Sequence, residues 1–422
     1  MATTTDDFVN ALKETYEDGI KDQLNRDVVL YDALQTNTRK VKLEGSHLAF
    51  SVKLGRAYGA HAIGEGGDLP TAGDATRAKG KIEPKDVWGR TQLTKRLMAV
   101  AKTNRGAFAD ALADKMDDLQ EDLKYEVARA LVGNKTDLLV SSAAATGVLG
   151  KTSNSGTTAT SLNLELNSGN VQLRPEMPIF IGTAADFGPA GTGGAAATVT
   201  SVVDETTVTI SSATWASGEY VVRGDSRDRN AYDKEFTGIA HIVDDADKLF
   251  DIDPSSSPAW SAYVDDNGAI ARPWSHDLMN KMVRSIKTQS GKRPDYITGH
   301  DAQVDEIANT LVSDVRYEPC KFKGGYERSF LTWNNGERDV PIVPDEMFAP
   351  GSLYFLNMDC LAMCETVPMG FDETDSLMQR VTDKISFEIV YGTIGNLACF
   401  QRNAHGRLDD LQYDTANFAF AN

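Results

Sequence analysis

Residues 103–133 read TNRGAFADALADKMDDLQEDLKYEVARALVG and form the most strongly helical stretch of the chain. Their apolar residues recur every three or four positions while Asp and Glu occupy the opposite face, which is typical of an amphipathic helix. The apolar residues are Phe108, Leu112, Met116, Leu119, Leu123, Val127 and Leu131. Thr103 or Asn104 can cap the start, and Gly133 can end the helix. At 1.5 Å per residue, about thirty residues span about 40 Å, so we expect a spine on which other elements pack.

A long glycine-rich loop between two strands precedes this helix. Residues 48–52 alternate between apolar and polar, which is the period of a half-buried strand, and the chain becomes strand-like again around Ile82. Seven glycines lie between residues 55 and 80. The connection of about 25 residues is too long for a tight hairpin, which takes two to five. We therefore expect a projecting loop, and loops of this length are usually functional or disordered.

The residues at the start of the chain predict a helix with one narrow apolar stripe. Within residues 6–36 apolar side chains recur at spacings of four, namely Phe8, Leu12, Tyr16, Ile20 and Leu24. One stripe must be buried against something. Two interpretations carry equal weight: a helix packed on the core of its own subunit, and an arm laid on a neighbouring subunit.

The composition changes twice after the long helix. First Thr, Ser, Gly and Ala dominate, and short β-rich runs separated by turn signals predict a small all-β unit, a barrel or sandwich, at about residues 150–235. An α/β pattern follows, with a helix that is capped by Ser275 and stopped by Gly291. Asn335-Gly336 predicts a type I′ hairpin turn, and a long final strand alternates from Ile385 onward.

None of the motifs that suggest chemistry is complete. Gly150-Lys151-Thr152 looks like the end of a phosphate-binding loop, but the first glycine of that motif is missing and a helix-hostile stretch follows. Asp265-Asp266-Asn267-Gly268 suggests a calcium loop, yet the first ligand position is Tyr263 and the closing position is Trp274. The aspartates at residues 244–253 could hold a weak cation, but a solvated acidic face is the simpler interpretation. We therefore predict no catalytic, metal-binding or cofactor-binding residues and no enzymatic activity.

The composition limits the function further. The 422 residues carry 61 acidic and 43 basic side chains, a net charge of −18, which argues against binding a phosphate backbone through clustered Lys and Arg. Four cysteines do not make a disulfide framework, and the first residues lack the basic and apolar segments of a signal peptide. No apolar run approaches the length of about 18 residues that spans a bilayer. We expect a soluble, acidic protein made in a reducing compartment, with no membrane partner.

The order of the parts is arm, glycine-rich loop, long helix, β-rich insertion, α/β lobe and final strand. This order resembles the major capsid proteins of tailed double-stranded-DNA bacteriophages, which have the Hong Kong 97-type shell fold. Glu235-Phe236-Thr237-Gly238-Ile239 and Ile252-Asp253-Pro254 look like the segment that such proteins carry before their axial domain. Pro341-Ile342-Val343-Pro344-Asp345 and Pro350-Gly351-Ser352-Leu353-Tyr354 look like their closing part. The resemblance covers about residues 40–411.

The resemblance implies an α+β, Hong Kong 97-like capsid fold with an N-arm, an E-loop, a peripheral domain with a long spine helix and an axial domain. It also implies an inserted small all-β domain that is similar to a β-barrel. The implied boundaries are 1–38 for the N-terminal arm, 39–95 for the E-loop, 96–149 for the peripheral domain with its spine helix, 150–235 for the insertion, 236–274 for the continued peripheral domain, 275–349 for the axial domain and 350–422 for the final part of the peripheral domain.

The function that the resemblance implies is that of a major capsid protein. Such a protein assembles itself as pentamers and hexamers into an icosahedral phage head around the double-stranded DNA genome. The implied location is the virion capsid, after assembly in the host cytoplasm. The implied partners are further copies of the chain, a separate scaffolding protein, which Met1 favours, a portal, a decoration protein, and packaged DNA bound without sequence specificity. The alternative is an encapsulin-type shell of a bacterial nanocompartment, against which the β-insertion and the longer chain argue.

The resemblance also indicates where copies of the chain meet. The candidates for contacts between subunits lie in the E-loop and are Gly55, Gly64, Gly66, Gly67, Lys79 and Lys81. Some members of the family cross-link a loop lysine to an asparagine on a neighbour. The candidates for such a cross-link are Lys53, Lys79, Lys81 and Lys85 with Asn396 or Asn403 as partners. The more ordinary interpretation is that these are solvated surface side chains.

Overall fold

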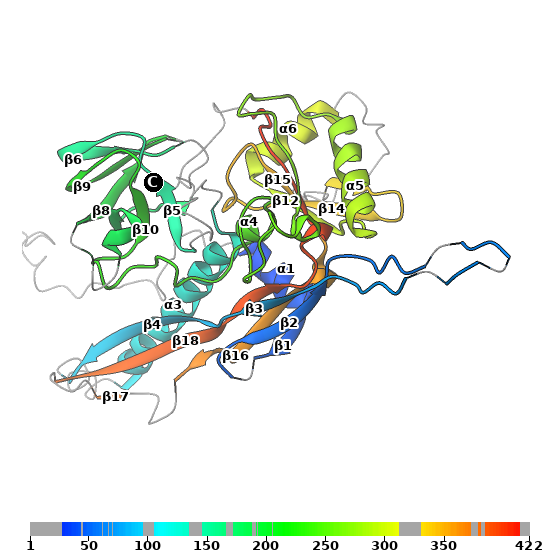
Figure 1. Cartoon of the computed structure of the whole chain (residues 1–422). Coiled ribbons are helices and arrows are strands. Elements are labelled where there is room, and N and C mark those ends of the chain that lie inside the picture. Colours follow the sequence, from blue (N-terminus) through cyan, green and yellow to red (C-terminus); the bar gives the residue numbers. More distant parts are fainter. Residues whose placement is uncertain are drawn as a thin grey trace, which may run out of the picture.

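The computed structural model of the chain describes residues 28–43, 45–60, 62–65, 67–69, 71–95, 105–134, 146–165, 172–187, 191, 193–204, 206–311, 331–372, 379–380 and 385–413. These residues form three parts (Figure 1). They are an elongated unit, which contains one long helix and a five-stranded sheet, a six-stranded β unit, and an α/β lobe. None of the described helices is both long enough and apolar enough to cross a membrane.

The long helix predicted from the sequence is confirmed as α3, Arg105–Val132. Its end is formed as expected, because Gly133 has a φ of +71° and donates its N–H to the Arg129 carbonyl at 3.1 Å. The residues predicted to cap its start, Thr103 and Asn104, lie outside the described residues. Among the members of the predicted apolar stripe from Met116 onward, Leu123, Val127 and Leu131 are buried.

A shorter helix, α1, Val29–Asn37, packs against α3 in the main core. Leu30 and Leu34 are only 1% and 0% exposed, and the N–H of Leu30 donates to Asp345 Oδ2 at 3.2 Å. For this part of the predicted arm, packing on the core of its own subunit is therefore correct. The apolar stripe from Phe8 to Leu24 lies outside the described residues.

A five-stranded sheet covers one side of α3, and its central strand is β18, Ser386–Cys399. The other strands are β1 (Arg39–Lys42), β4 (Lys85–Thr94), β16 (Leu361–Phe371) and β17 (Gln379–Arg380). β18 runs antiparallel to β16, β17 and β4, whereas β1 is parallel to β16. A Cβ added at Gly89 would lie 3.0 Å from Leu119 Cδ1, so this glycine allows α3 to approach the sheet closely.

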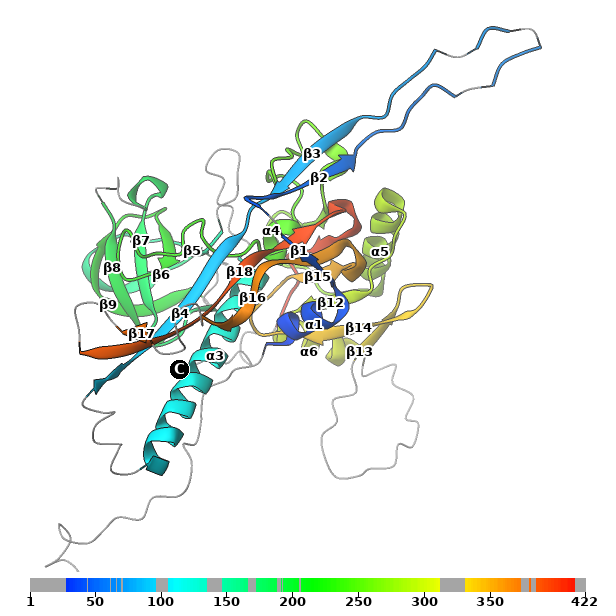
Figure 2. The same cartoon turned by 90° about the horizontal axis from the view of Figure 1, so that it is seen from below.

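The glycine-rich loop predicted before the long helix is confirmed. β2, Leu48–Lys53, and β3, Arg77–Ile82, form a separate antiparallel ribbon in which Lys53 lies opposite Arg77. Residues 54–76 connect the two strands, and Figures 1 and 2 both show this blue loop directed away from the rest of the molecule. The ribbon then continues through residues 83–84 into β4, so the loop is directly connected to the five-stranded sheet.

The six-stranded β unit follows α3 and has its own core. Its strands are β5 (Val148–Lys151), β6 (Gly156–Asn163), β7 (Pro178–Gly182), β8 (Ala195–Val202), β9 (Thr207–Trp215) and β10 (Tyr220–Arg223). They are arranged in the order β5-β10-β7-β8-β9-β6, and the bridge between Thr152 and Leu164 joins the two outer strands, so the sheet closes on itself. The chain enters and leaves at one point, because Asp233 N donates to the Thr146 carbonyl at 2.8 Å.

The α/β lobe holds a second six-stranded sheet, in the order β11-β19-β15-β12-β14-β13. Its elements are β11 (Tyr263–Asp265), β12 (Tyr296–Gly299), β13 (Leu331–Asn334), β14 (Asp339–Pro344), β15 (Leu353–Leu356), β19 (Gly406–Leu408), α5 (His276–Ser290) and α6 (Asp301–Leu311). The predicted limits of α5 are confirmed: Ser275 Oγ accepts the N–H of Leu278, and Gly291 has a φ of +76°. The remaining short helical elements are α4 (Ile239–Ile242), η3 (Ala184–Asp186), η4 (Pro258–Trp260), η6 (Met358–Cys360) and η7 (Arg402–Ala404).

The hairpin predicted at Asn335-Gly336 is confirmed, because β13 and β14 pair antiparallel, but the type I′ geometry predicted for its turn is wrong. Asn334 pairs with Asp339, so four residues form the hairpin loop, and only Gly336 of the Asn-Gly pair has positive φ. The Asn335 side chain is buried instead, where Nδ2 donates to the Pro294 carbonyl at 2.8 Å and Oδ1 accepts two loop N–H groups. A tertiary hydrogen bond has therefore replaced the local turn geometry that the dipeptide alone predicts.

Candidate assembly surface

The loop between β2 and β3 presents apolar side chains to solvent. Tyr58, Leu69 and Ile63 are 87%, 84% and 48% exposed. Such side chains gain stability when another molecule covers them, because burial removes apolar surface from water. We call the described residues 62–65 and 67–69, which surround the turn at Gly64, the loop tip. It is the first candidate for a contact surface.

The glycines of the loop have two structural roles. The Gly67 N–H donates to the Gly64 carbonyl at 3.0 Å, and a Cβ added at Gly64 would meet nothing within 4 Å. The tip is therefore an open turn that a neighbour can approach. At Gly80, by contrast, an added Cβ would lie 2.5 Å from Phe50 Cζ, so the missing side chain lets this ring cross the ribbon. The predicted contact residue Gly66 lies outside the described residues.

The predicted loop lysines differ in their surroundings. Lys81 Nζ lies 3.7 Å from Asp251 Oδ2. Lys85 Nζ lies 3.3 Å from Asp233 Oδ1 and donates to the carbonyl of the same residue at 2.7 Å. Lys53 and Lys79 are exposed, and within the described part of the chain neither has an ion-pair partner. Two lysines thus connect the base of the ribbon to the body, and two remain available to other molecules.

The two predicted asparagine partners also differ. Asn396 is only 2% exposed, and its Nδ2 donates to the Glu83 carbonyl at 2.8 Å. Its Oδ1 accepts the N–H groups of Thr237 and Leu397 at 2.8 and 2.9 Å. Asn403 is half-buried and donates to the Gln289 carbonyl at 3.3 Å. Asn396 is therefore a structural side chain with both of its amide atoms occupied.

Two open cavities flank the ribbon. One, of about 310 Å³, brings Lys81, Lys85 and Asn396 together with Asp233 and Asp251. The other, of about 500 Å³, lies where the loop joins the body, and we call it the root cavity. Its lining comes from β2 and the start of the loop, η4, the end of α5 and residues 400–403. The sequence alone gave no sign of either cavity, because their walls come from distant segments.

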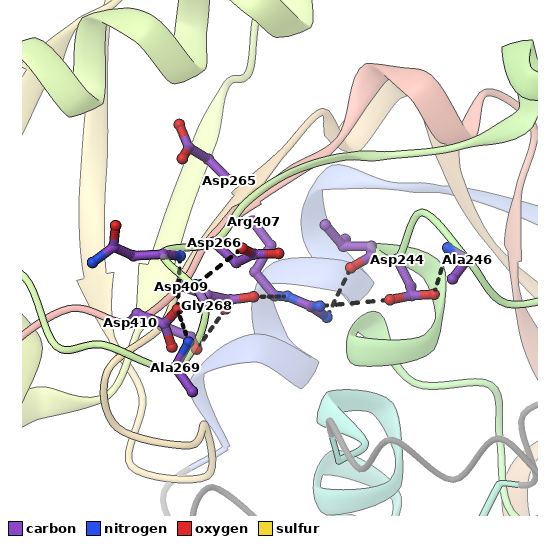
Figure 3. Close-up of polar contacts among 12 residues, drawn as sticks. Asp244, Ala246, Asp265, Asp266, Gly268, Ala269, Arg407, Asp409 and Asp410 are labelled. Carbon is purple, nitrogen blue, oxygen red and sulfur yellow. Dashed lines mark hydrogen bonds and ion pairs between the residues drawn. The ribbon is translucent and has the colours of Figure 1, made fainter.

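A buried arginine cluster joins the lobe to the elongated unit. Arg407 Nε donates to Asp409 Oδ2 at 2.9 Å and Nη1 donates to the Val243 carbonyl at 3.0 Å, while Nη2 lies 3.5 Å from Asp244 Oδ1. Figure 3 shows Arg407 between the carboxylates of Asp409 and Asp244. Burial alone lowers the pKa of Arg407, but Asp409, Tyr354 and Asp244 outweigh that effect and raise it, so the guanidinium stays charged. Sequence reasoning missed this cluster, since an arginine in a polar segment gives no signal.

A second arginine holds the same segment from another side. Arg402 is completely buried, and its guanidinium donates to the carbonyls of Ile242, Asp247 and His241 at 2.9, 2.6 and 3.2 Å. Because three carbonyl groups accept from one side chain, residues 241–247 are fixed against η7. Arg402 also lines the root cavity.

The acidic residues singled out in the sequence do not converge on a cation. Asp244 accepts the N–H groups of Ala246 and Asp247, whereas Asp251 pairs with Lys81 and Lys248. Asp410, beside Ala269 in Figure 3, accepts the N–H groups of Asn267 and Ala269 at 2.7 and 3.0 Å and so holds the Asp-Asp-Asn-Gly turn. Within the described ranges no group of three or more His, Cys, Asp or Glu side chains could hold a metal ion. The segment at Gly150-Lys151-Thr152 lies in and just after β5, not at a helix start.

Comparison with known proteins gives matches at the level of structure. No protein-family model and no curated protein matches the sequence. The capsid asymmetric unit of cyanophage A-1(L) matches with a TM-score of 0.57 and 11% identity, over 97% of this chain and 99% of that chain. The capsid of a native GTA particle matches with a TM-score of 0.48 and 10% identity, over 96% of both chains. The holo-SrpI encapsulin complex from Synechococcus elongatus PCC 7942 matches with a TM-score of 0.45 and 10% identity, over 99% of this chain and 100% of that chain.

The cyanophage match extends over nearly the whole of both chains, so it includes the loop, the long helix, the lobe and the final strand in one arrangement. At 11% identity this likeness concerns the fold. The α+β architecture expected from the order of the parts is confirmed at that level. The chain has the Hong Kong 97-type capsid fold.

Proposed function

We propose that this chain is the major capsid protein of a tailed bacteriophage and that it assembles as pentamers and hexamers into an icosahedral head around double-stranded DNA. The observation that carries the proposal is the ribbon of β2 and β3, whose loop leaves the body of the subunit and exposes Tyr58, Leu69 and Ile63. A loop of this kind is stable only when it lies on another molecule. A shell built from copies of one chain supplies that surface through head-to-tail contacts that close into rings.

The domain assignment is part of the same proposal. Residues 39–95 would form the E-loop, residues 96–149, 236–274 and 350–422 the peripheral domain, and residues 275–349 the axial domain. Residues 150–235 would form an inserted domain. The closed sheet of β5 to β10 and its separate core around Leu149, Ile181 and Val208 support this last boundary. The proposed partners are further copies of the chain, a scaffolding protein, a portal, a decoration protein and the packaged DNA, and the proposed location is the virion.

Assembly of the pure protein tests the proposal. The chain is expressed with and without a candidate scaffolding protein, and the products are examined by negative-stain electron microscopy and by sedimentation. We expect closed icosahedral particles. A monodisperse monomer under every condition would contradict the proposal. Particles that hold a protein cargo and no nucleic acid in their native host would instead indicate a nanocompartment shell.

A covalent bond between a loop lysine and an asparagine of a neighbour stays a prediction. Lys53 and Lys79 are exposed and have no ion-pair partner in the described part of the chain, while Asn403 is the more accessible of the two asparagines. Denaturing gels of assembled particles test it, because a cross-linked shell gives a ladder of oligomers. Monomer bands alone would exclude the cross-link.

A further inference from the structure

The ribbon that carries the loop has an uneven distribution of charge. Its base, residues 45–56 and 77–82, contains Lys53, Arg56, Arg77, Lys79 and Lys81 and no Asp or Glu. Lys53 lies directly opposite Arg77 in the β2–β3 register, although like charges in that position repel each other. Lys81 pairs with Asp251 at 3.7 Å, but none of the other four cations has an acidic partner among the described residues. In a chain with a net charge of −18, such a basic surface fits an acidic partner.

The root cavity lies at this basic base. Lys53 and Arg56 are exposed and line it, and Phe400 and Trp260 form an aromatic floor, each with its ring centroid within 6.1 Å of that of Phe50. The accessible part of this floor is the half-buried ring of Phe400, because Trp260 is only 1% exposed. Of the described residues that line the cavity, none is acidic. The space of about 500 Å³ is large enough for one or two side chains of a docking segment. The cavity thus offers a cationic rim and an apolar floor.

The loop tip has the complementary chemistry. Glu65 and Asp68 are exposed, and within the described part of the chain neither carboxylate has a cationic partner. Ile63 and Leu69, 48% and 84% exposed, flank them. The two carboxylates of the loop tip are complementary in charge to the cationic rim of the root cavity, and its two aliphatic side chains suit the apolar floor.

The tip does not lie near the root cavity of its own chain. Figures 1 and 2 both show the loop extending away from the body, and about ten residues separate Leu54 from the tip. At about 3.3–3.6 Å per residue, an extended segment of that length reaches about 35 Å, a distance comparable to the width of a neighbouring subunit. A second copy of the chain is therefore the occupant that the geometry favours.

We propose that the loop tip of one subunit docks in the root cavity of the next, with Glu65 and Asp68 facing Lys53 and Arg56 and with Leu69 or Ile63 on the aromatic floor. The inference rests on the proposed function and specifies the partner surface of the loop. Each subunit donates one tip and accepts another, so the contact is head-to-tail and closes into a ring. The same contact explains why the basic base and the acidic tip occur on one loop.

Single charge reversals and their combination test the docking. Arg56→Glu and Asp68→Lys are each expected to raise the protein concentration for half-maximal assembly about fivefold or more, because each ring repeats the weakened pair. The double variant Arg56→Glu/Asp68→Lys restores an opposite-charge pair and should assemble close to the wild-type concentration. Arg284→Glu, at an exposed position of α5 outside the cavity, and Asp74→Lys, in the same loop but outside the tip, are the matched controls and should have smaller effects.

A direct probe of the contact uses mixed cysteine variants. Particles assembled from Arg56→Cys and Asp68→Cys chains together should form disulfide-linked dimers on a non-reducing gel, whereas particles of either variant alone, or of the wild-type chain, should not. If wild-type particles form but the double charge variant assembles no better than the single ones, or no mixed dimers appear, the docking is wrong while the shell function stands. If the wild-type chain forms no particles, the proposed function itself fails. Impairment by Arg56→Glu only when a scaffolding protein is present, with Asp68→Lys harmless, would overturn the inference in favour of a different acidic protein.

Discussion

Arg407 Nη2 and Asp244 Oδ1 lie 3.5 Å apart, although one residue is in the last strand of the lobe and the other is in the turn after α4. This pair belongs to the buried cluster that also contains Asp409, which is only 1% exposed. The cluster connects the lobe to the elongated unit, so its loss should lower the stability of both parts.

Replacing Arg407 by methionine tests that connection. Arg407→Met removes the cation that pairs with the buried carboxylate of Asp409 and leaves Asp244 with Arg402 at 3.9 Å, and we expect a loss of about 3–5 kcal/mol in the free energy of unfolding. Urea unfolding followed by tryptophan fluorescence measures it. The control is Arg229→Met, because Arg229 has a side chain that is 74% exposed and pairs with Asp225 only at the surface. That control should change the stability by less than about 1 kcal/mol, and a loss as large as that of Arg407→Met would contradict the role of burial.

The buried histidines predict that the protein loses stability in acid. Burial lowers the pKa of His405 to about 3, with Lys292 and Arg402 adding to the effect, and burial lowers the pKa of His300 to about 4. Below about pH 6.5 the unfolded chain takes up protons at these sites and the folded chain does not, so stability falls as the pH drops toward the folded-state pKa values. Between pH 6.5 and 5 each histidine should remove about 2 kcal/mol.

Unfolding curves at pH 7, 6 and 5 check this prediction. His405→Gln lowers the stability at pH 7, because it disturbs a buried side chain, but it should flatten the dependence on pH. Thr298→Val, at a buried position without a titrating group, disturbs the lobe as well but should leave that dependence unchanged. A His405→Gln variant with the full wild-type slope would show that this histidine does not contribute.

Two glycines at helix ends form a matched pair. Gly133 and Gly291 have φ values of +71° and +76°, so alanine at either position costs about 1–2 kcal/mol for the left-handed conformation. A Cβ at Gly133 would also lie 3.1 Å from Gly238 Cα, whereas one at Gly291 would meet nothing within 4 Å. Gly133→Ala should therefore be the more destabilising change in thermal unfolding. Equal losses would mean that the contact between the end of α3 and the start of α4 relaxes freely.

The exposed loop leucine should matter to assembly and not to folding. Leu69→Ser changes a side chain that is 84% exposed, so the free energy of unfolding of the single chain should stay within about 0.5 kcal/mol of wild type. The yield of particles should fall, because the apolar surface that a neighbour covers is lost. Ile270→Ser, at a position that is 67% exposed in the turn after β11, is the control and should leave the yield unchanged. Wild-type particle yield from Leu69→Ser would remove this side chain from the assembly surface.

Patterns that depend on neighbours in sequence were predictable. The periodicity from Met116 to Leu131 gave α3, Ser275 and Gly291 gave both ends of α5, and the glycine-rich connection gave the projecting loop. In each case the deciding interaction is local, either a helix face, a cap or a chain too long for a tight turn. Local interactions were therefore enough to predict the order of the elements, and that order indicated the fold.

Features that depend on distant segments were not predictable. Asn335 does not adopt the predicted turn geometry, because its side chain donates to the buried Pro294 carbonyl. The Asn396 side chain is buried, where it bonds to the Thr237 N–H and the Glu83 carbonyl. The root cavity likewise exists only because β2, η4 and residues 400–403 meet in space. Residue types and their spacings do not show which distant segments come into contact.

The hydrogen bond between Asp233 N and the Thr146 carbonyl places the two ends of the β unit side by side. A linker of two or three residues could therefore replace the whole unit without stretching the chain, and the loop-closure entropy would change little. Because the unit has a hydrophobic core of its own, it can be removed or exchanged without opening the core around α3. The β unit thus has a single attachment point on the chain, and this point is a natural position for grafting a foreign domain.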